Sequence, residues 1–158
     1  MNTTSPQHRV QSLLDAAQEE AKLHPAFFIT KGPGAGDHST AAYIAALRKR
    51  LHVQFGSDLA EHPILPGTGI RVDYWLPEEQ TIVEIALGLK NPLSEFERDV
   101  LKAVVSRATG LQVNTLVLLG KPGAFRRMES PWFKHVRAWA KEQGVTVLVH
   151  ELRSESAV

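Results

Sequence analysis

The stretch Ile70–Leu89, IRVDYWLPEEQTIVEIALGL, decides the fold of this chain. Two runs of alternating apolar residues flank Pro77–Gln80, a pattern typical of a β-hairpin with a four-residue loop. One face is then apolar on both strands: Leu76 pairs with Thr81, Tyr74 with Val83, Val72 with Ile85, and Ile70 with Leu87. On the other face Arg71 pairs with Ala86, Asp73 with Glu84, and Trp75 with Ile82. The register therefore predicts that Asp73 and Glu84 lie directly across from each other.

The composition bounds the class of protein. Of the 158 residues, 43% are hydrophobic and 22% are charged, values typical of one soluble domain with its own core. The formal net charge of +1 favours neither an acidic nor a basic partner for the chain as a whole. The lack of cysteine excludes disulfides, thiolate nucleophiles and zinc sites built on thiolates. The sequence shows neither an apolar run of about 18 residues nor a signal-peptide pattern, so we expect a cytoplasmic protein without a membrane partner.

Outside the hairpin, periodicity and capping signals predict helices that alternate with strands. The expected helices are Gln7–Leu23, Ser39–Leu51, Ser94–Thr109 and Pro131–Gln143, and the expected strands are Ala26–Thr30, His52–Phe55, His62–Leu65, Asn114–Leu119 and Val145–Leu152. This order favours an α/β fold with a mixed sheet, in which an antiparallel hairpin leads into parallel strands flanked by helices. We expect a single domain over residues 1–158, with an N-terminal helix (1–25), a core (39–120) and a C-terminal helix and strand (131–152).

Asp73 and Glu84 carry the functional signal. Opposed side chains on paired strands have Cβ atoms about 5 Å apart, and two carboxylates at that separation destabilise the sheet unless their charge is offset. A divalent metal ion, a shared proton or a neighbouring cation can provide the offset. Arg71 lies two residues before Asp73 on the same face, within reach of both acids. The residues therefore form either a surface cluster of one cation and two acids or a metal site.

These residues resemble the PD-(D/E)XK nuclease superfamily. Ile70–Trp75 is similar to the first acidic strand of its motif and Ile82–Leu87 to the second, and the order of elements from Ser39 to Leu119 is similar as well. The resemblance implies a restriction-endonuclease-like core within residues 39–120. It also implies Mg²⁺ or Mn²⁺ bound by Asp73, Glu84 and the carbonyl of Ile85, and a metal-activated water that hydrolyses nucleic-acid phosphodiesters. DNA is favoured over RNA as the partner, and a homodimer is one arrangement known in the family.

Two positions depart from the motif of that family. Val72 occupies its proline position, a replacement that the family tolerates. Ala86 stands at the position of its catalytic lysine, so no side chain there can orient or deprotonate the attacking water. Arg71 is the cation best placed to fill this volume as a catalytic or phosphate-contacting neighbour, although a guanidinium stays protonated and cannot act as a base.

Other residues are candidates for the missing groups. Lys90 lies about 20 Å beyond Glu84 along an extended strand. Lys102 is expected to point to solvent, because it lies nearly opposite the helical stripe formed by Phe96, Val100, Val104 and Ala108. Glu61 and Glu20 are candidates for a third acid of the metal site.

A basic segment follows the strand Asn114–Leu119. Gly120–Lys141 has one acid, Glu129, and a local charge of +5 from its six bases Lys121, Arg126, Arg127, Lys134, Arg137 and Lys141. These bases either form a solvated surface or hold nucleic-acid phosphates. On the helix within this segment, a separate stripe is expected to lie in the core: Trp132, Phe133, Val136, Trp139 and Ala140.

The glycine loop Gly32–Gly36 favours a different class, because a strand, a glycine turn and a helix in that order can bind a phosphate. Asp37 stands where the dinucleotide fingerprint needs a third glycine, and no Gly-Lys pair of a phosphate loop is present. The histidines show no metal-ligand spacing, although His38 and His62 lie near the candidate segments. The resemblance to the PD-(D/E)XK superfamily implies a metal-dependent nuclease, which is the function we expect. The alternatives are a degenerate nuclease-like domain that binds nucleic acid or a protein, and a nucleotide-binding module.

Overall fold

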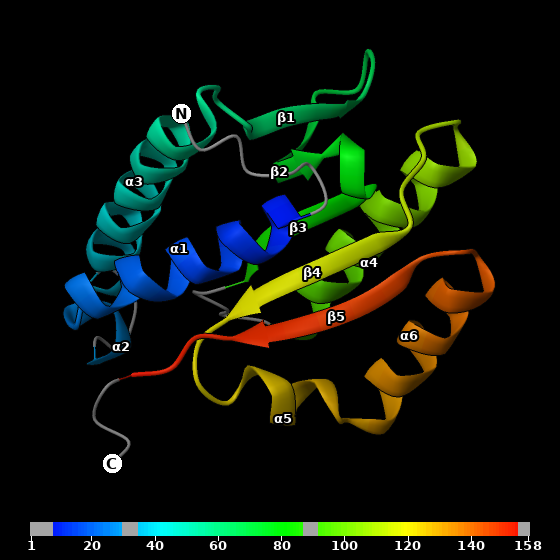
Figure 1. Ribbon diagram of the computed structural model, residues 1–158. Helices are drawn as coiled ribbons and strands as arrows, with labels where there is room; N and C mark the ends of the chain where they lie inside the picture. Colours follow the sequence, from blue (N-terminus) through cyan, green and yellow to red (C-terminus); the bar gives the residue numbers. More distant parts are fainter. Residues whose placement is uncertain (1–7, 30–34, 87–91, 155–158) are drawn as a thin grey trace.

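The structure, a computed structural model, describes residues 8–29, 35–86 and 92–154. Its described residues form a five-stranded sheet in the order β1-β2-β3-β4-β5, together with six α-helices (Figure 1). Strands β1 (Ala60–Leu65), β2 (Ile70–Leu76) and β3 (Thr81–Ala86) are antiparallel neighbours, whereas β3, β4 (Thr115–Gly120) and β5 (Thr146–Glu151) are parallel. The predicted mixed α/β sheet, with a hairpin that leads into parallel strands, is confirmed.

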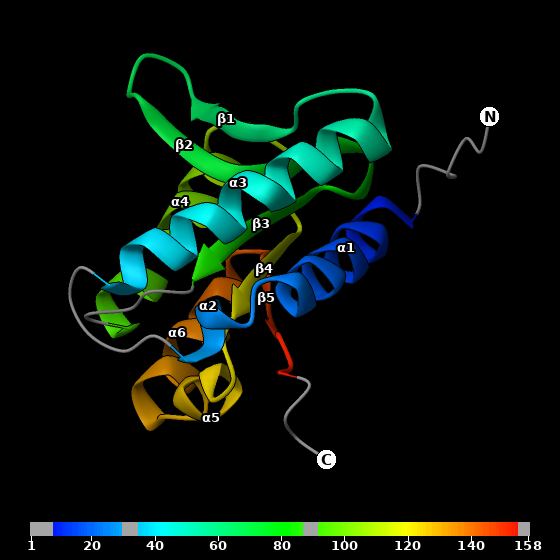
Figure 2. The same ribbon diagram turned by 90° about the vertical axis from the view of Figure 1, so that its left-hand side faces the viewer.

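Helices cover both faces of the sheet (Figures 1 and 2). On one face lie α1 (Arg9–Leu23), α2 (Ala26–Ile29) and α3 (Ala35–Phe55), and on the other α4 (Pro92–Ala108), α5 (Ala124–Met128) and α6 (Pro131–Glu142). Each face has its own core. The α1-side core includes Leu13, Tyr43, Leu47, Tyr74, Val83, Val117 and Leu119, and the α4-side core includes Val72, Trp75, Ile82, Phe96, Val100, Leu116 and Phe133.

Three local predictions are wrong. Ala26–Ile29 is a helical turn and not a strand, because Phe27 is fully buried and stacks on Tyr43 of α3, with ring centroids 4.5 Å apart. The segment His52–Phe55 is not a strand either, because α3 continues to Phe55 and ends only before Gly56, which has a φ of +70°. The basic segment after β4, for which the sequence predicted no helix before Pro131, contains the short helix α5.

The hairpin register is confirmed only as far as Tyr74. Tyr74 pairs with Val83 and Leu76 with Thr81, as predicted. The predicted pair of Val72 with Ile85 is wrong, because Val72 packs in the α4-side core while Tyr74 packs in the α1-side core. The ladder between β2 and β3 ends at Tyr74. On the other side of β2, Glu61 of β1 lies beside Asp73 and has a φ of +53°. The regular alternation of faces is therefore lost at Asp73. Leu87 lies outside the described residues.

The apolar stripe of α6 is only partly buried, contrary to the prediction that it lies in the core. Phe133 and Ala140 are fully buried, but Trp132 is 57% exposed and Trp139 is 41% exposed. Both tryptophans line a groove between α4 and α6, on the outer side of the helix layer. None of the helices in the described part of the chain combines the length and the apolar composition needed to cross a bilayer.

Candidate functional site

Strands β2 and β3 separate at Asp73 and Glu84. The first residues of β2, from Ile70 to Val72, pair with β1 but not with β3. The last residues of β3, Glu84–Ala86, pair with β4 but not with β2. Side chains bridge the two strands where their ladder ends. The Asp73 main-chain N–H donates to Glu84 Oε2 at 3.2 Å, and the Ile85 N–H donates to Asp73 Oδ2 at 2.6 Å. The two acids therefore meet at the fork between the strands.

Lys102 of α4 completes this cluster. Its Nζ lies 2.8 Å from Glu84 Oε1 and 3.1 Å from Asp99 Oδ1, and its side chain is only 16% exposed. The prediction that Lys102 points to solvent is wrong. The buried residues of α4 follow a stripe rotated from the predicted one: Phe96, Asp99, Val100, Ala103, Val104 and Ser106. The predicted stripe was built from apolar residues alone, so it left out the buried polar residues Asp99 and Ser106. For this reason the prediction placed Lys102 on the solvent side of the helix.

Burial and like charge control the protonation of these acids. Glu84 is 4% exposed, and burial raises its pKa to about 8, with further contributions from the charges of Asp73 and Asp99 and from a hydrogen bond with Asp73. Burial also raises the pKa of Asp99, against the effect of Lys102. Burial lowers the pKa of Lys102, but its hydrogen bond to Glu84 and the charges of both acids outweigh that effect and raise it overall. Lys102 is therefore an ammonium at neutral pH.

The charges of the cluster suit a divalent cation. If Asp73, Glu84 and Asp99 all ionise, the single ammonium leaves two negative charges without a partner, and the charges of Asp73 and Asp99 add to the larger effect of burial in raising the pKa of Glu84. Carboxylate oxygens are ligands that Mg²⁺ and Mn²⁺ prefer. No three His, Asp or Glu side chains converge into a complete protein-only metal site in residues 8–29, 35–86 and 92–154. Mg²⁺ commonly binds through one or two carboxylates and fills its remaining positions with water and substrate phosphate.

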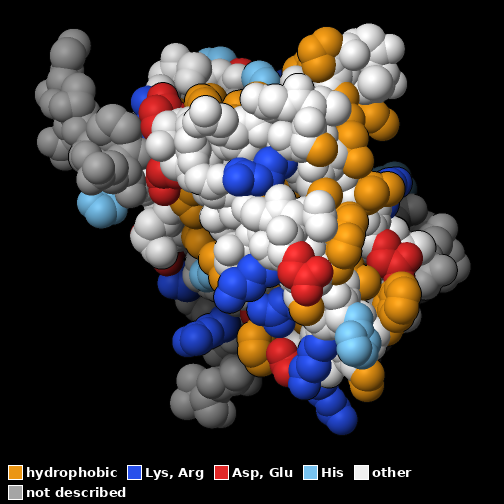
Figure 3. All heavy atoms as spheres, turned by 90° about the vertical axis from the view of Figure 1, so that its right-hand side faces the viewer, with side chains coloured by type: hydrophobic (Ala, Val, Ile, Leu, Met, Phe, Trp, Pro, Cys, Tyr) orange, Lys and Arg blue, Asp and Glu red, His pale blue; other side chains and the backbone are white. Residues whose placement is uncertain are grey.

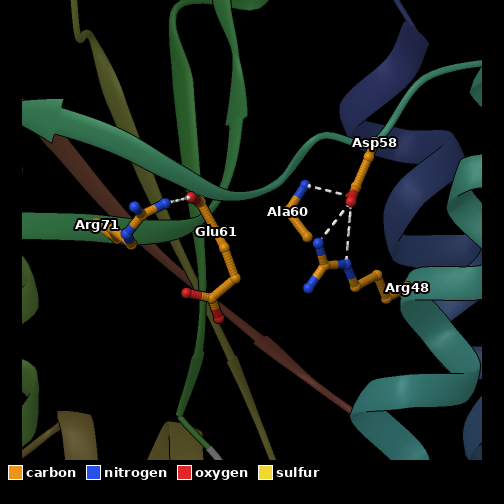
Figure 4. A network of polar contacts seen from close by, with 5 residues as sticks. All are labelled: Arg48, Asp58, Ala60, Glu61 and Arg71. Atoms are coloured by element: carbon orange, nitrogen blue, oxygen red, sulfur yellow. Dashed lines mark hydrogen bonds and ion pairs between the residues drawn. The ribbon is translucent and has the colours of Figure 1, made fainter.

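Arg71 does not join the acids. Its side chain is exposed, and its Nη1 donates to the carbonyl of Glu61 at 2.8 Å (Figure 4). Because β2 leaves β3 at Asp73, Arg71 pairs across from Pro63 of β1 and not from Ala86 of β3. Figure 4 also shows the neighbouring ion pair of Arg48 with Asp58, 2.5 Å long, which ties α3 to the segment before β1.

The two candidates for a third acid differ in position. Glu61 is an exposed neighbour of Asp73 on β1. Glu20 lies elsewhere, on α1, and Arg50 Nε of α3 donates to its carboxylate at 2.6 Å. Neither sequence candidate is the acid that contacts Lys102, which is Asp99. Lys90 and Gly32–Gly34 lie outside the described residues, while α3 begins at Ala35.

The six bases of the basic segment fall into two groups. Gly120 pairs with Ala86, so Lys121 and α5 lie at the edge of the sheet where β3 ends, two residues beyond Glu84. Lys121 Nζ lies 4.3 Å from the centroid of the Phe27 ring, and burial lowers its pKa. Arg126 and Arg127 are exposed on α5. On α6, Lys134 and Arg137 both pair with Glu129, and Lys141 is exposed in the last turn.

Comparisons with family models, with curated proteins and with solved structures found no significant match for this chain.

Proposed function

We propose that this chain is a metal-dependent phosphodiesterase that hydrolyses nucleic acid, with a restriction-endonuclease-like core and its active site at Asp73, Glu84 and Lys102. The observation that carries the proposal is the ion pair between Lys102 and Glu84 at the fork of β2 and β3. The resemblance in sequence lacked one element, a lysine beside the two acids, because Ala86 occupies its position. Lys102 brings an ammonium to the same acids from the neighbouring helix.

Each residue has a distinct role in this proposal. Asp73 and Glu84 would hold Mg²⁺ or Mn²⁺, together with the Ile85 carbonyl. When bound, the metal supplies Lewis acidity toward the phosphate and lowers the pKa of a coordinated water. Lys102 donates hydrogen bonds to the attacking water or to a phosphate oxygen, and it stabilises negative charge that develops during hydrolysis. Because its pKa is raised, it acts as a cation and not as a general base. Asp99 orients the ammonium from the opposite side.

The basic residues beside the site provide the contacts to the phosphate backbone in this proposal. Arg126 and Arg127 form no ion pair within the described residues, and they lie at the carboxyl edge where β3 and β4 end. The DNA backbone carries closely spaced phosphates, whose counterions are released when cations of the protein bind. A nucleic acid seated on Glu84 would therefore reach the guanidinium groups of α5. DNA is the polymer we propose, with RNA as the comparison.

Removing these two guanidinium groups is expected to weaken DNA binding. We expect the variant Arg126→Ala/Arg127→Ala to bind a DNA duplex about 10-fold more weakly at moderate salt, and the slope of log K against log salt to decrease by up to about 2. Fluorescence anisotropy over a series of salt concentrations measures both quantities. Lys134→Ala is the matched control, because Glu129 already pairs with Lys134. An unchanged slope in the double variant would exclude α5 from the interface.

A cleavage assay tests the proposed function. Wild-type chain is incubated with plasmid DNA and with single-stranded RNA in Mn²⁺, in Mg²⁺ and in EDTA, beside Asp73→Asn. We expect cleavage of DNA that requires the metal and falls at least about 100-fold in the variant. Binding of DNA without cleavage in either metal would contradict the proposal, and it would favour the degenerate nuclease-like domain instead.

A further inference from the structure

We propose that a polar pocket at the end of the sheet where β3 and β4 begin binds a phosphate group, with Arg107 as its anchor. The pocket has a volume of about 410 Å³ and is lined by Gln80, Arg107, Gly110, Leu111, Gln112 and Asn114. Strands β4 and β5 start on the right-hand side of Figure 1, and Figure 3 faces that side of the molecule. Near the middle of the surface in Figure 3, Lys or Arg side chains lie among uncharged polar and main-chain atoms.

The side chains of this pocket form one chain of hydrogen bonds. Arg107 Nη1 donates to Asn114 Oδ1 at 2.6 Å, and Asn114 Nδ2 donates to Gln80 Oε1. Gln80 Nε2 then donates to Gln112 Oε1 at 2.7 Å. Each of the three amide oxygens therefore accepts a hydrogen bond from its neighbour, which fixes the orientation of the amides. Within the described residues, the amide of Gln112 at the end of the chain has two N–H donors without a protein partner.

Arg107 supplies the charge of the pocket. Its Nη1 uses both hydrogens within the protein, because it also donates to the Val113 carbonyl at 2.9 Å. Its Nε and Nη2 form no hydrogen bond or ion pair in the described part of the chain, where every buried side-chain nitrogen has a partner. Both nitrogens are therefore open to solvent. Their two N–H groups are parallel, an arrangement that matches two oxygens of one phosphate or carboxylate.

The surroundings of Arg107 leave this edge of the guanidinium uncovered. Gly144, in the turn before β5, has no side chain there, and a Cβ at this position would lie 2.9 Å from Nη2 and closer still to Nε. The φ of Gly144 is +88°, a conformation that also favours glycine. The described residues that line the pocket include no carboxylate. An anion at Arg107 therefore meets a positive charge and N–H donors, and no acid of the pocket competes with it.

The number of donors favours a phosphate over a carboxylate. The two parallel donors of Arg107 occupy both oxygens of a carboxylate, whereas a phosphate keeps further oxygens for the amide of Gln112. This phosphate belongs to a small phosphorylated molecule or to a nucleic-acid backbone, since both present the same oxygens. The pocket is separate from the proposed nuclease site, because Gln80 precedes Glu84 by four residues, about 13 Å along an extended chain. Phosphate binding here does not depend on the proposed activity.

Nuclear magnetic resonance of the full chain tests this site through the Nε–H signal of Arg107, which Arg107→Lys identifies by removing it. Inorganic phosphate is titrated to about 50 mM at constant ionic strength, beside acetate and beside a single-stranded oligonucleotide in EDTA. We expect phosphate to shift this signal saturably and acetate to bind at least about 10-fold more weakly. A shift at far lower concentrations of oligonucleotide than of phosphate identifies the nucleic-acid backbone as the source, and the reverse order identifies a small molecule.

A matched pair of variants tests the donors directly. Gln112→Glu places a carboxylate in the same pocket as the unpaired donors of Arg107, where it competes with phosphate. We expect this variant to bind phosphate about 10-fold more weakly than wild type. Gln54→Glu changes the charge equally at an exposed position of α3, and we expect its affinity to equal that of wild type. The remaining signals of each spectrum show whether the variant is folded.

Three outcomes would overturn the proposal. The Arg107 signal does not respond to phosphate or to the oligonucleotide, it responds to acetate as strongly as to phosphate, or Gln112→Glu and Gln54→Glu bind phosphate equally well. None of them bears on the proposed nuclease activity, which is tested by metal binding at Asp73 and Glu84.

Discussion

Replacing Lys102 with methionine is expected to lower the rate of metal-dependent DNA cleavage by about 100-fold to 1,000-fold. Methionine preserves the length of the side chain but removes the ammonium that contacts Glu84 and Asp99. Losing one preorganised donor at a site where charge develops typically costs a factor of this size. The measurement is the single-turnover rate of cleavage of a labelled duplex at saturating Mn²⁺ and with the protein in saturating excess over the duplex, so that weaker DNA binding does not enter the rate.

Two variants separate chemistry from folding in this experiment. Methionine leaves two buried acids without their cation, and a buried pair that loses one partner can destabilise a protein by about 3–5 kcal/mol. Lys102→Gln can still donate to Glu84, so it is the variant to use if Lys102→Met unfolds. Lys49→Met, an exposed position on α3, is the control for removal of a charge. Cleavage by folded Lys102→Met or Lys102→Gln at the wild-type rate would exclude Lys102 from the proposed active site.

Replacing Glu84 with glutamine is expected to stabilise the metal-free protein at alkaline pH. The pKa of Glu84 rises from an ordinary value of 4.5 to about 8 on folding, chiefly through burial. Between these two values the folded chain holds a proton that the unfolded chain releases, so the free energy of unfolding falls as the pH rises. Each unit of pKa shift is worth about 1.4 kcal/mol, so the fall due to Glu84 is a few kcal/mol by pH 8.5. Glutamine carries no such penalty.

Denaturant unfolding in EDTA between about pH 4.5 and pH 9 measures this effect as the difference between variant and wild type. We expect the two proteins to converge near pH 4.5 and the variant to be more stable at pH 8.5. Added Mn²⁺ should restore stability to wild type at pH 8.5 and have little effect on Glu84→Gln, because ligand binding stabilises only the chain that binds it. Glu142→Gln, an exposed site on α6, is the control. If the difference in the free energy of unfolding between Glu84→Gln and wild type does not change with pH, the raised pKa of Glu84 is contradicted.

The sequence predicted the hairpin and the parallel strands because their signals are local. Alternation on both sides of Pro77–Gln80 fixes a register, and a continuous apolar run such as that of β4 requires cover on both faces. The prediction from this alternation is wrong at Val72, because a strand with two neighbours can stop pairing with one of them while it still pairs with the other. From Ile70 to Val72, strand β2 pairs with β1 only, and no feature of the hairpin sequence predicts this.

The sequence likewise predicted some residues of the candidate site and missed another. The proximity of Asp73 and Glu84 was predictable, because the pair of Tyr74 with Val83 brings the next residues of both strands together, although Asp73 and Glu84 are not ladder partners. Lys102 was not, because its direction depends on the angle at which α4 packs on the sheet. The signal available in the sequence was the pair Asp99 and Lys102, three residues apart and within one turn of the apolar residue Val100. An acid and a base on the core-facing side of a helix indicate a buried partner, here Glu84.

Calorimetric titration of Mn²⁺ tests the central claim most directly, because the proposed chemistry requires a metal ion between Asp73 and Glu84. Wild type, Asp73→Asn and Glu84→Gln are titrated at alkaline pH, each with and without a short DNA duplex to supply phosphate oxygens. We expect saturable binding to wild type, strengthened by DNA, and a loss of at least about 10-fold in affinity in both variants. Equal and weak binding to all three proteins, in the presence of DNA as in its absence, would contradict the account.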